Sequence, residues 1–555
     1  MVKGHTEKRA LMVSEVIVVF LILALANFIG SRFFMRFDLT PDKLYSLAPA
    51  SKEVVLTLPD ILNVDVFISS KVPAEMVGLV GDIRDLFSEY EAYAGRNLRI
   101  RYYDPSSDMK VADNAKRLGI QELQVQVMNR DKLEVAKAWL GCAVQYEDKK
   151  EIIPSITSIQ SLEYDLTSAM VKVTQDKLPK IGILTIAGPQ IQGQAQNRFN
   201  SLRQLISSEF DVVTVSFEAE EKIPEDVTAL FISDTWGISD FGKYLIDQYL
   251  MRGGKLIWFI DGITLGQGMQ AYPSLPGIEE MMKGWGISLD RRLLMDMQCA
   301  QAGFQTSWGT IMMEYPCWVE IQPIYFSKDF PVTSLLENVT LQWASPVKAE
   351  VPEALPAECK IEVEPVMFSS PDSWLMQSPF NLDPTQNWNT VSKVEPGSHS
   401  VAVYAKGIFP SSFAGKEVPK PPVPQVAEGE DPGLSPNVEI PEKQEISSKP
   451  GEILAVGCAR FAGDEFLPQF PANQIFLLNV ADYFGYGNKL IGIRSRGETS
   501  RPLNGELTPI QKNLWKYLNI LLMPILVIVY GGVRYMLKRM RRARIAARYA
   551  SGGGA

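Results

Sequence analysis

The chain has 555 residues, a net charge of −9 at pH 7, 46% hydrophobic residues and 21% charged residues. This length has room for roughly three or four domains, and the composition is typical of a chain that buries hydrophobic cores. Seven basic residues near the C-terminus have no acidic residue among them, and without them residues 1–533 carry −16. These seven are Arg534, Lys538, Arg539, Arg541, Arg542, Arg544 and Arg548. Because residues 1–533 carry a large negative charge, they repel a polyanion, and we predict that nucleic acid is not a partner.

Two residue types limit the chemistry of the chain. Histidine occurs only at His5, in a polar leader, and at His399, so a histidine triad or a zinc hydrolase would rest on His399 alone. The cysteines have no CxxC or metal-type spacing, and we predict no metal site and no cofactor. Single thiols are the main interpretation, with a Cys299–Cys317 or Cys317–Cys359 disulfide as the alternative in an oxidising compartment. The five are Cys142, Cys299, Cys317, Cys359 and Cys458.

Residues 11–31 are predicted to form a first transmembrane helix. The run from Val16 to Gly30 is uncharged, and with Leu11 to Val13 it is long enough to cross about 30 Å at about 1.5 Å per residue. A cleaved signal peptide is the alternative, because Ala24-Leu25-Ala26 has the small-x-small form. The apolar run continues beyond that site, which favours an uncleaved anchor. The leader, residues 1–10, carries Lys3, Lys8 and Arg9.

Residues 38–177 are predicted to form a thioredoxin-like α/β module. A helix that runs to Leu58, capped by Ser46 or Ser51, precedes elements in the order βαβαββα. The strands are read from "NVDVFIS", "LRIRYYDP", "LQVQVMN" and "AVQYED". The catalytic CxxC of thioredoxins is absent, so no redox activity is expected.

Residues 178–295 are predicted to form a doubly wound α/β domain. Apolar strands ("KIGILTIAG", "VVTVSF", "TALFISD", "KLIWFID") alternate with helical segments, as in a parallel sheet covered by helices. Short β-like runs over 296–415 predict a β-rich insertion. The Pro- and acid-rich residues 416–450 predict a flexible loop. Residues 451–503, with "EILAVGCARF", "NQIFLLNVADYFG" and "LIGIRSR", are predicted to return to the α/β domain.

A second transmembrane helix is predicted over 514–537, kinked at Pro524, and a basic cytoplasmic tail follows over 538–555. A buried helix of a soluble domain is the alternative. Basic residues flank both apolar segments on their outer sides, and the positive-inside rule places both termini in the cytoplasm. Residues from about 38 to 512 then lie on the other side of the membrane, as the periplasmic body of a two-pass inner-membrane protein.

The sequence contains partial matches to nucleotide-binding motifs, but none of them is complete. The three Gly-Lys pairs continue as Gly-Lys-Tyr, Gly-Lys-Leu and Gly-Lys-Glu, so the chain has no P-loop and is not itself an ATPase of that class. "GQGMQA", Gly266 to Ala271, matches GxGxxA, but Pro273 interrupts the helix that would receive a pyrophosphate. A surface loop is the prediction there.

Three acidic residues, Asp104, Asp234 and Asp261, follow predicted strands. Open α/β sheets bind ligands outside the carboxyl ends of their strands, so these residues mark a candidate edge for a ligand or a partner. Turn and helix-cap roles are the alternative interpretation. No GxSxG nucleophile elbow occurs, and no catalytic residue is assigned.

Several motifs, in order, resemble GldG-type auxiliary components of bacterial ABC transport systems linked to gliding motility. They are "RFDLTPDKLYSLAPAS", "DIRDLFSEYEAYA", "LRIRYYDP", "SLEYDLTSAM", "KIGILTIAGP", "DQYLMRGGKLIWFIDG" and "NQIFLLNVADYFG". The resemblance runs from about residue 32 to 503 and is weakest over 300–450. It implies a membrane-anchored periplasmic subunit that works with a separate ABC ATPase and a multi-spanning permease, and it supplies no catalytic residues.

The functional prediction is therefore a non-enzymatic subunit of an ABC transporter complex that couples or binds an extracytoplasmic partner or cargo. Self-association is left open. One alternative is a stand-alone envelope protein that recognises polysaccharide or protein. Another is an external hydrolase that uses Asp234 and Asp261, which would require catalysis by two carboxylates without a histidine.

Overall fold

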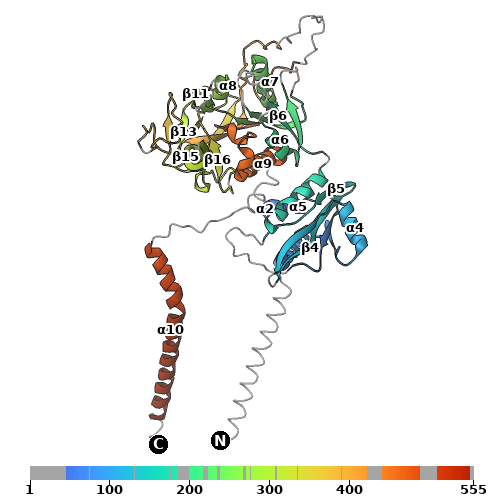
Figure 1. The fold of residues 1–555 in the computed structure, drawn as a ribbon, viewed down its shortest axis with the longest axis vertical. Coiled ribbons are helices and arrows are strands. Elements are labelled where there is room, and N and C mark those ends of the chain that lie inside the picture. Colours follow the sequence, from blue (N-terminus) through green and yellow to red (C-terminus); the bar gives the residue numbers. More distant parts are fainter. Residues whose placement is uncertain are drawn as a thin grey trace. The chain divides into compact units, whose positions relative to one another are not determined.

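The computed structural model describes most of the chain (Figure 1). The chain divides into two compact units, residues 1–498 and 499–555. The described residues are 46–73, 76–129, 132–175, 177–185, 199–216, 223–233, 238–266, 270–274, 277–306, 309–333, 336–388, 390–421, 440–487 and 509–550.

The larger unit begins with an α/β module. Its described elements are α2 (Pro49–Leu56), β1 (Leu62–Ile68), α3 (Val77–Ala94), β2 (Leu98–Tyr103), α4 (Met109–Arg117), β3 (Glu122–Asn129), β4 (Lys132–Tyr146), β5 (Lys149–Ile153) and α5 (Ile159–Thr174). Strand β1 lies parallel to β2 and antiparallel to β4. The sheet order is β2-β1-β4-β3, and β5 also pairs with β4.

Two details of this module differ from the predictions. Strand β5 is missing from the predicted order βαβαββα, because its sequence "KKEII" offers no apolar run until its last two residues. The first helix begins at Pro49 with Ala48 as its N-cap residue and no side-chain cap, so the predicted caps Ser46 and Ser51 are wrong. Ser51 instead donates its hydroxyl to the Glu163 carboxylate of α5, at 2.7 Å.

The second part of the larger unit is built on a seven-stranded sheet in the described residues. Its elements are β6 (Lys180–Thr185), α6 (Asn200–Ser207), β7 (Asp211–Val215), β8 (Val227–Ser233), α7 (Asp240–Met251), β9 (Lys255–Phe259), α8 (Glu279–Gly284), β18 (Lys360–Phe368), β20 (Ser400–Ile408), β21 (Gly451–Val456) and α9 (Pro471–Tyr486). The order is β18-β20-β21-β9-β8-β6-β7. The five strands from β21 to β7 are parallel, and β20 and β18 continue the sheet in antiparallel fashion.

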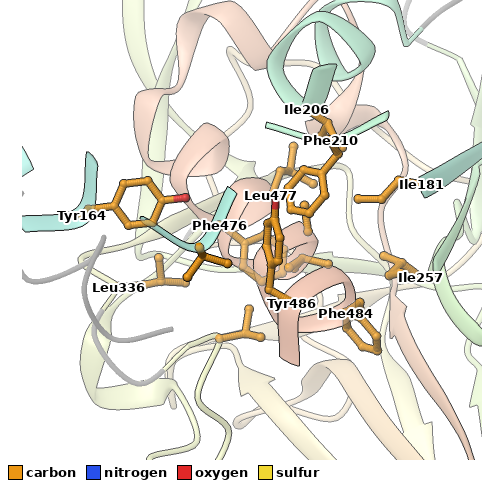
Figure 2. Packing of buried hydrophobic residues seen from close by; sticks show 14 of the residues in the cluster. Tyr164, Ile181, Ile206, Phe210, Ile257, Leu336, Phe476, Leu477, Phe484 and Tyr486 are labelled. Carbon is orange, nitrogen blue, oxygen red and sulfur yellow. The ribbon is translucent and has the colours of Figure 1, made fainter. Parts of the chain in front are cut away.

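Successive side chains of the parallel strands pack against different helices on the two faces of this sheet. In β8, Phe231 belongs to the hydrophobic cluster that contains residues of α6 and α9, whereas its neighbour Ile232 belongs to the cluster that contains residues of α7 and α8. Successive side chains of a strand point to opposite faces, so helices cover both faces and the strands are apolar on both sides. Figure 2 shows part of the first cluster, in which Phe476 and Leu477 of α9 lie close to Ile206 and Phe210.

The stretch predicted as a separate β-rich insertion, 296–415, is divided between two roles. Strands β18 and β20 belong to the main sheet, while the smaller strands form local pairs and a three-stranded sheet β14-β15-β16 in the described part of the chain. Hydrophobic alternation predicts where strands lie but not which strands pair with each other. The sequence therefore did not distinguish the strands of the main sheet from those of the local sheets. The small strands of this stretch are β14 (Cys299–Thr306), β15 (Gly309–Ile321), β16 (Val339–Gln342), β17 (Val347–Ala349) and β19 (Trp374–Met376), and those just before it are β10 (Ile263–Leu265), β11 (Ala271–Pro273), β12 (Ile287–Leu289) and β13 (Leu293–Met295).

The second unit contains the helix α10, Pro509–Ala550. Within it, Trp515–Ala543 is long and apolar enough to cross a membrane, and this is the one such helix in the described residues. The helix continues past the predicted boundary at 537, so the first part of the basic tail is helical, and Pro524 lies inside it. The predicted first transmembrane helix over 11–31 lies outside the described residues, as do Lys3, Lys8 and Arg9.

Candidate ligand edge of the α/β domain

The carboxyl edge of the parallel sheet is the place where a doubly wound fold would bind a ligand. The chain passes from β6 to β7 on one side and then to β8 and β9 on the other, so the direction of winding reverses between β6 and β8. Ligands of open α/β sheets bind outside the carboxyl ends of the strands at such a reversal. Thr185 and Ser233 end these two strands and are paired in register.

Asp261 lies at this edge, just after β9, and joins β9 to the end of β21. Its Oδ1 accepts a hydrogen bond from the Ala459 amide at 2.7 Å, and its Oδ2 lies 3.8 Å from Arg460 Nε. The carboxylate therefore fixes the chain where it leaves β21. This is the turn-stabilising role that was the alternative interpretation for this residue.

Two glycines beside Asp261 allow close packing of the same edge. A Cβ atom at Gly262 would lie 2.3 Å from the Ser345 hydroxyl oxygen, and one at Gly457 would lie 1.9 Å from the Ser345 carbonyl oxygen. The Ser345 amide donates to the Gly457 carbonyl at 2.8 Å. The segment between β16 and β17 thus reaches the sheet edge only because both positions lack a side chain.

Asp104 does not join Asp261. It follows β2 in the five-stranded sheet of the first module, where its Oδ1 accepts hydrogen bonds from the Ser106 amide at 2.9 Å and the Ser70 amide at 3.2 Å. Burial raises its pKa, but hydrogen bonds from Ser106 and Ser70 outweigh this and lower the pKa to about 2. Asp234, the third predicted residue, lies outside the described residues.

The N-terminus of α6, which also faces the carboxyl edge, is occupied by a carboxylate of the chain itself. Asp464 accepts a hydrogen bond from the Ser201 amide at 2.6 Å and one from Asn200 Nδ2 at 3.3 Å. In nucleotide-binding folds the helix after the first strand offers this position to phosphate. Sequence reasoning missed Asp464, because it lies more than 260 residues from its partners and carries no local motif.

The glycine-rich stretch predicted as a surface loop joins two strands of a hairpin. Strand β10 pairs with β11 in antiparallel fashion, and the Gly266 amide donates to the Gln270 carbonyl at 2.8 Å. Pro273 is the last residue of β11, so no helix follows the glycines to receive a pyrophosphate. The described residues on either side of this stretch therefore form two paired strands, and not the strand–turn–helix geometry of a dinucleotide site.

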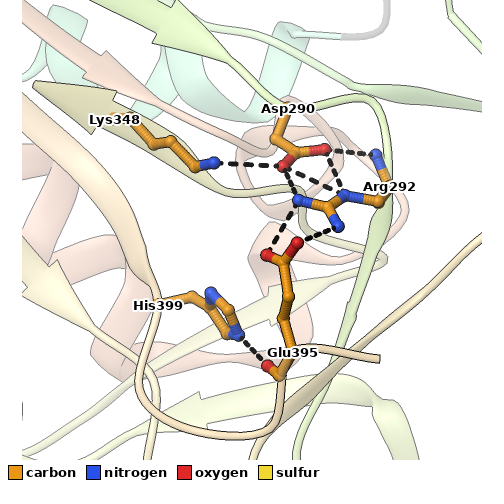
Figure 3. A network of polar contacts seen from close by, with 5 residues as sticks. All are labelled: Asp290, Arg292, Lys348, Glu395 and His399. Atoms are coloured by element: carbon orange, nitrogen blue, oxygen red, sulfur yellow. Dashed lines mark hydrogen bonds and ion pairs between the residues drawn. The ribbon is translucent and has the colours of Figure 1, made fainter. Parts of the chain in front are cut away.

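His399, the only histidine among the described residues, belongs to a charged network next to β12, β13 and β17 (Figure 3). Its Nε2 contacts the Glu395 carbonyl at 2.8 Å. Arg292 lies 2.5 Å from Asp290 and 2.8 Å from Glu395, and Lys348 lies 3.5 Å from Asp290. Burial raises the Asp290 pKa, but bonding and attraction to Arg292 outweigh it and hold the pKa below its usual value.

Neither thiols nor metal ligands form a reactive centre in the described residues. All five cysteines are free, so neither of the two disulfides considered above is formed in this structure. Burial raises the pKa of Cys317 to about 12, which keeps this thiol protonated and unreactive at neutral pH. Among the described positions, no group of three or more His, Cys, Asp or Glu side chains is placed to hold a metal ion.

The contacts of Asp261 with Ala459 and Arg460 lead to a stability prediction. Asp261→Ala should lower the free energy of unfolding by about 1–3 kcal/mol, because the part-buried Ala459 amide loses its acceptor and Arg460 loses a nearby negative charge. Thermal unfolding of the full chain in detergent measures this loss. Glu225→Ala, at an exposed site before β8, is the control and should change the melting temperature little. An unchanged melting temperature for Asp261→Ala would contradict the structural role.

Comparison with known proteins identifies the α/β domain. Residues 178–484, from β6 to α9, match the family model described as ABC-type uncharacterized transport system, and residues 41–145 match a domain family of unknown function, DUF7088. An uncharacterized protein of Borreliella burgdorferi is 20% identical over 518 residues, covering 91% of this chain and 93% of that protein.

Among solved structures, the N-terminal domain of mmIFT52 is similar with a TM-score of 0.31, 8% identity, and coverage of 55% of this chain and 97% of that one. A ThuA-like protein of Bacteroides uniformis ATCC 8492 gives a TM-score of 0.29, 11% identity, and coverage of 57% and 97%. The family model spans more than half of the chain, including every strand of the seven-stranded sheet. The chain belongs to the family of auxiliary components of ABC-type transport systems.

Proposed function

We propose that the protein is a non-enzymatic, membrane-anchored subunit of an ABC transport complex, whose folded body binds or couples a partner or cargo outside the cytoplasm. The family match over 178–484 carries this proposal. An auxiliary component without a P-loop must take its energy from a separate ATPase, and one or two membrane helices are too few to form a transport path alone. The partners are therefore an ABC ATPase and a multi-spanning permease.

The geometry of the described polar residues, at the carboxyl edge and around His399, favours binding or coupling over catalysis. Asp261 and Asp464 hold backbone amides of the chain itself, and His399 contacts a backbone carbonyl. Polar groups that stabilise turns and helix ends in this way are not positioned as a nucleophile with its base. A partner that docks at this edge would meet a rigid, internally bonded surface.

The membrane arrangement is part of the same proposal. The helix α10 supplies one span, and the apolar segment 11–31 supplies a second. The basic residues outside each segment orient both termini toward the cytoplasm, with the body in the periplasm. The thioredoxin-like reading of 38–177 and the GldG-type resemblance make a transport system linked to gliding motility the specific form of this proposal.

Affinity purification of the full chain from its native membranes tests the proposal. In a mild detergent, an ABC ATPase and a multi-spanning permease should co-purify in fixed ratio to the protein and remain with it through size-exclusion chromatography. A control purification of an unrelated two-pass membrane protein from the same cells should lack both. Recovery of the protein alone, or with an envelope protein or polysaccharide and no transporter, would instead support a stand-alone binding protein.

A further inference from the structure

The hairpin of β14 and β15 has one strand edge that pairs with no described residue. Strand β14 is an outer strand of the sheet β14-β15-β16. It pairs with β15 in regular antiparallel register from Gln301, opposite Glu314, to Thr306, opposite Gly309. On its other side, this stretch forms no backbone hydrogen bond with the described part of the chain. The outward N–H and C=O groups of β14 are therefore available to a further strand.

The outer strands of the two larger sheets carry residues that prevent such pairing. Charged side chains and proline at a sheet edge keep other chains from adding a strand. The short strand β16 is covered instead, because Asn473 of α9 donates to the Thr340 carbonyl and accepts from the Thr340 amide, both at 2.9 Å. The protecting residues are Arg99 and Arg101 of β2, Glu122 of β3, Lys149, Lys150 and Glu151 of β5, Asp211 of β7, Lys360, Glu362, Glu364 and Pro365 of β18, and, on the free part of β15, Glu314 and Pro316.

Strand β14 has neither kind of protection. Its regular part, residues 301–306, has the sequence "QAGFQT", with no charged residue and no proline. On one face of the strand, Ala302 and Phe304 pack in a hydrophobic cluster with residues of β15 and β19. On the other face, Gln301 and Gln305 are exposed. The inner face therefore holds the strand in place while its edge stays open.

The sequence of β14 is complementary to itself when two copies run antiparallel. A two-fold axis at Gly303 places Gln301 of one chain opposite Gln305 of the second copy, and Ala302 opposite Phe304. Opposite glutamines can bond through their amides, and the small alanine leaves room for the phenylalanine ring. No like charges meet in this pairing, although the chain as a whole is negative. An interface that uses the same surface on both subunits is the usual form of a dimer.

Two side chains of the hairpin support this axis. Gln305 Nε2 donates to the Thr310 hydroxyl at 3.0 Å, which orients the amide and leaves its oxygen to accept from Gln301 of the second copy. Met312 lies opposite Gly303 and is 58% exposed, and a Cβ atom at Gly303 would lie 3.1 Å from the Met312 sulfur. The methionine therefore lies against its glycine. At the axis, the Met312 side chains of both copies would flank a pair of glycines and cover the space that these leave.

We propose that β14 pairs with β14 of a second copy of this chain, antiparallel and centred on Gly303. The pairing joins the two three-stranded sheets into one continuous sheet, β16-β15-β14-β14-β15-β16. A single strand pair buries less area than a standard interface. The dimer therefore depends on both chains being held in one membrane, which raises their effective concentration. The pairing is independent of the transporter partners proposed above, so either proposal can fail without the other.

Disulfide cross-linking of the full chain in its membranes tests the register. All variants carry Cys299→Ser, because the other four cysteines are buried. Chains with Gln301→Cys and chains with Gln305→Cys, made together with different tags and oxidised with copper phenanthroline, should cross-link only to each other. Opposite residues have Cα atoms about 4.5–5.5 Å apart, within reach of a disulfide, whereas each position lies about 13 Å from its own copy. Met312→Cys is the exposed control and should not cross-link, because about 14 Å separates its two copies. No cross-link between 301 and 305, or an equal one from Met312→Cys, would overturn the proposal.

Charge variants test the pairing itself. In the same background, Gly303→Cys should cross-link to its own copy at the axis. Adding Gln301→Lys with Gln305→Lys places lysines opposite each other at both ends and should lower the yield about tenfold. Adding Gln301→Lys with Gln305→Glu places opposite charges there and should keep the yield within about twofold. The two variants differ at one exposed position, and equal melting temperatures exclude misfolding as the cause. Equal yields from both, or cross-links to a different membrane protein in place of the second copy, would refute the proposal.

Discussion

Replacement of Gly457 by alanine is expected to prevent stable folding of the α/β domain. The added Cβ would lie 1.9 Å from the Ser345 carbonyl oxygen, which is backbone and cannot move away by changing rotamer. Gly457 is held on both sides, since its amide donates to the Val401 carbonyl at 2.9 Å and its carbonyl accepts from the Ser345 amide. Relief of the clash must break one of these bonds, so the expected loss is about 3 kcal/mol or more.

The experiment compares glycines in two environments. Gly284→Ala in α8 is the matched control, because the nearest atom to its new Cβ would be the Ser412 hydroxyl oxygen at 3.8 Å. Alanine also favours a helix, so this variant should be neutral or slightly stabilised. The thermal unfolding midpoint and the yield of monodisperse full chain are the measurements. A Gly457→Ala protein that unfolds at the original midpoint would show that the segment at Ser345 can shift freely.

Arg292→Met is expected to destabilise the protein by about 1–3 kcal/mol at pH 7, because removing one member of a part-buried charged network leaves the others without compensation. Arg292 bonds to Asp290 and Glu395 at once, and the Asp290 side chain is only 13% exposed (Figure 3). The methionine keeps the aliphatic length, so the loss reports mainly on charge and hydrogen bonding.

The dependence on pH separates this cause from lost packing. In the unmodified protein the Asp290 pKa lies below its usual 3.8, so its stabilising effect is present above that pH and disappears as the pH falls through the lowered pKa. Without Arg292 the carboxyl group protonates more readily. The deficit of the variant should therefore be largest above pH 4 and shrink below it. Arg291→Met, at the exposed neighbouring position, is the control, and an equal loss there would argue against the network.

The parallel strands were predictable because burial on both faces imposes a local pattern. "KIGILTIAG", "TALFISD" and "KLIWFID" overlap β6, β8 and β9, and "EILAVG" overlaps β21, which pairs with β9. Continuous apolar runs of this length suit few other structures. The charged strand β5 was not predictable because it offers no apolar run, and the role of Ser51 in α2 was not predictable because its partner Glu163 is 112 residues away.

The candidate site was less predictable than the fold, for a related reason. Asp261 follows β9 directly in the sequence, but its partner Ala459 is 198 residues away. The hydrogen bond from Tyr164 of α5 to Asp482 of α9 spans 318 residues. No local pattern marks such pairs, since the contacts exist only once both sheets and α9 are in place.

The place of β21 in the sheet has a consequence during synthesis. Strand β9 ends at Phe259, but the strand that covers its open edge begins only at Gly451, about 190 residues later. At a synthesis rate of about 5–20 residues per second, this edge remains without its partner for roughly 10–40 s. An uncovered apolar strand edge recruits other chains during such an interval. The edge of β9 is therefore open to association with other chains until β21 has been made, and truncation before residue 451 leaves β9 without this partner.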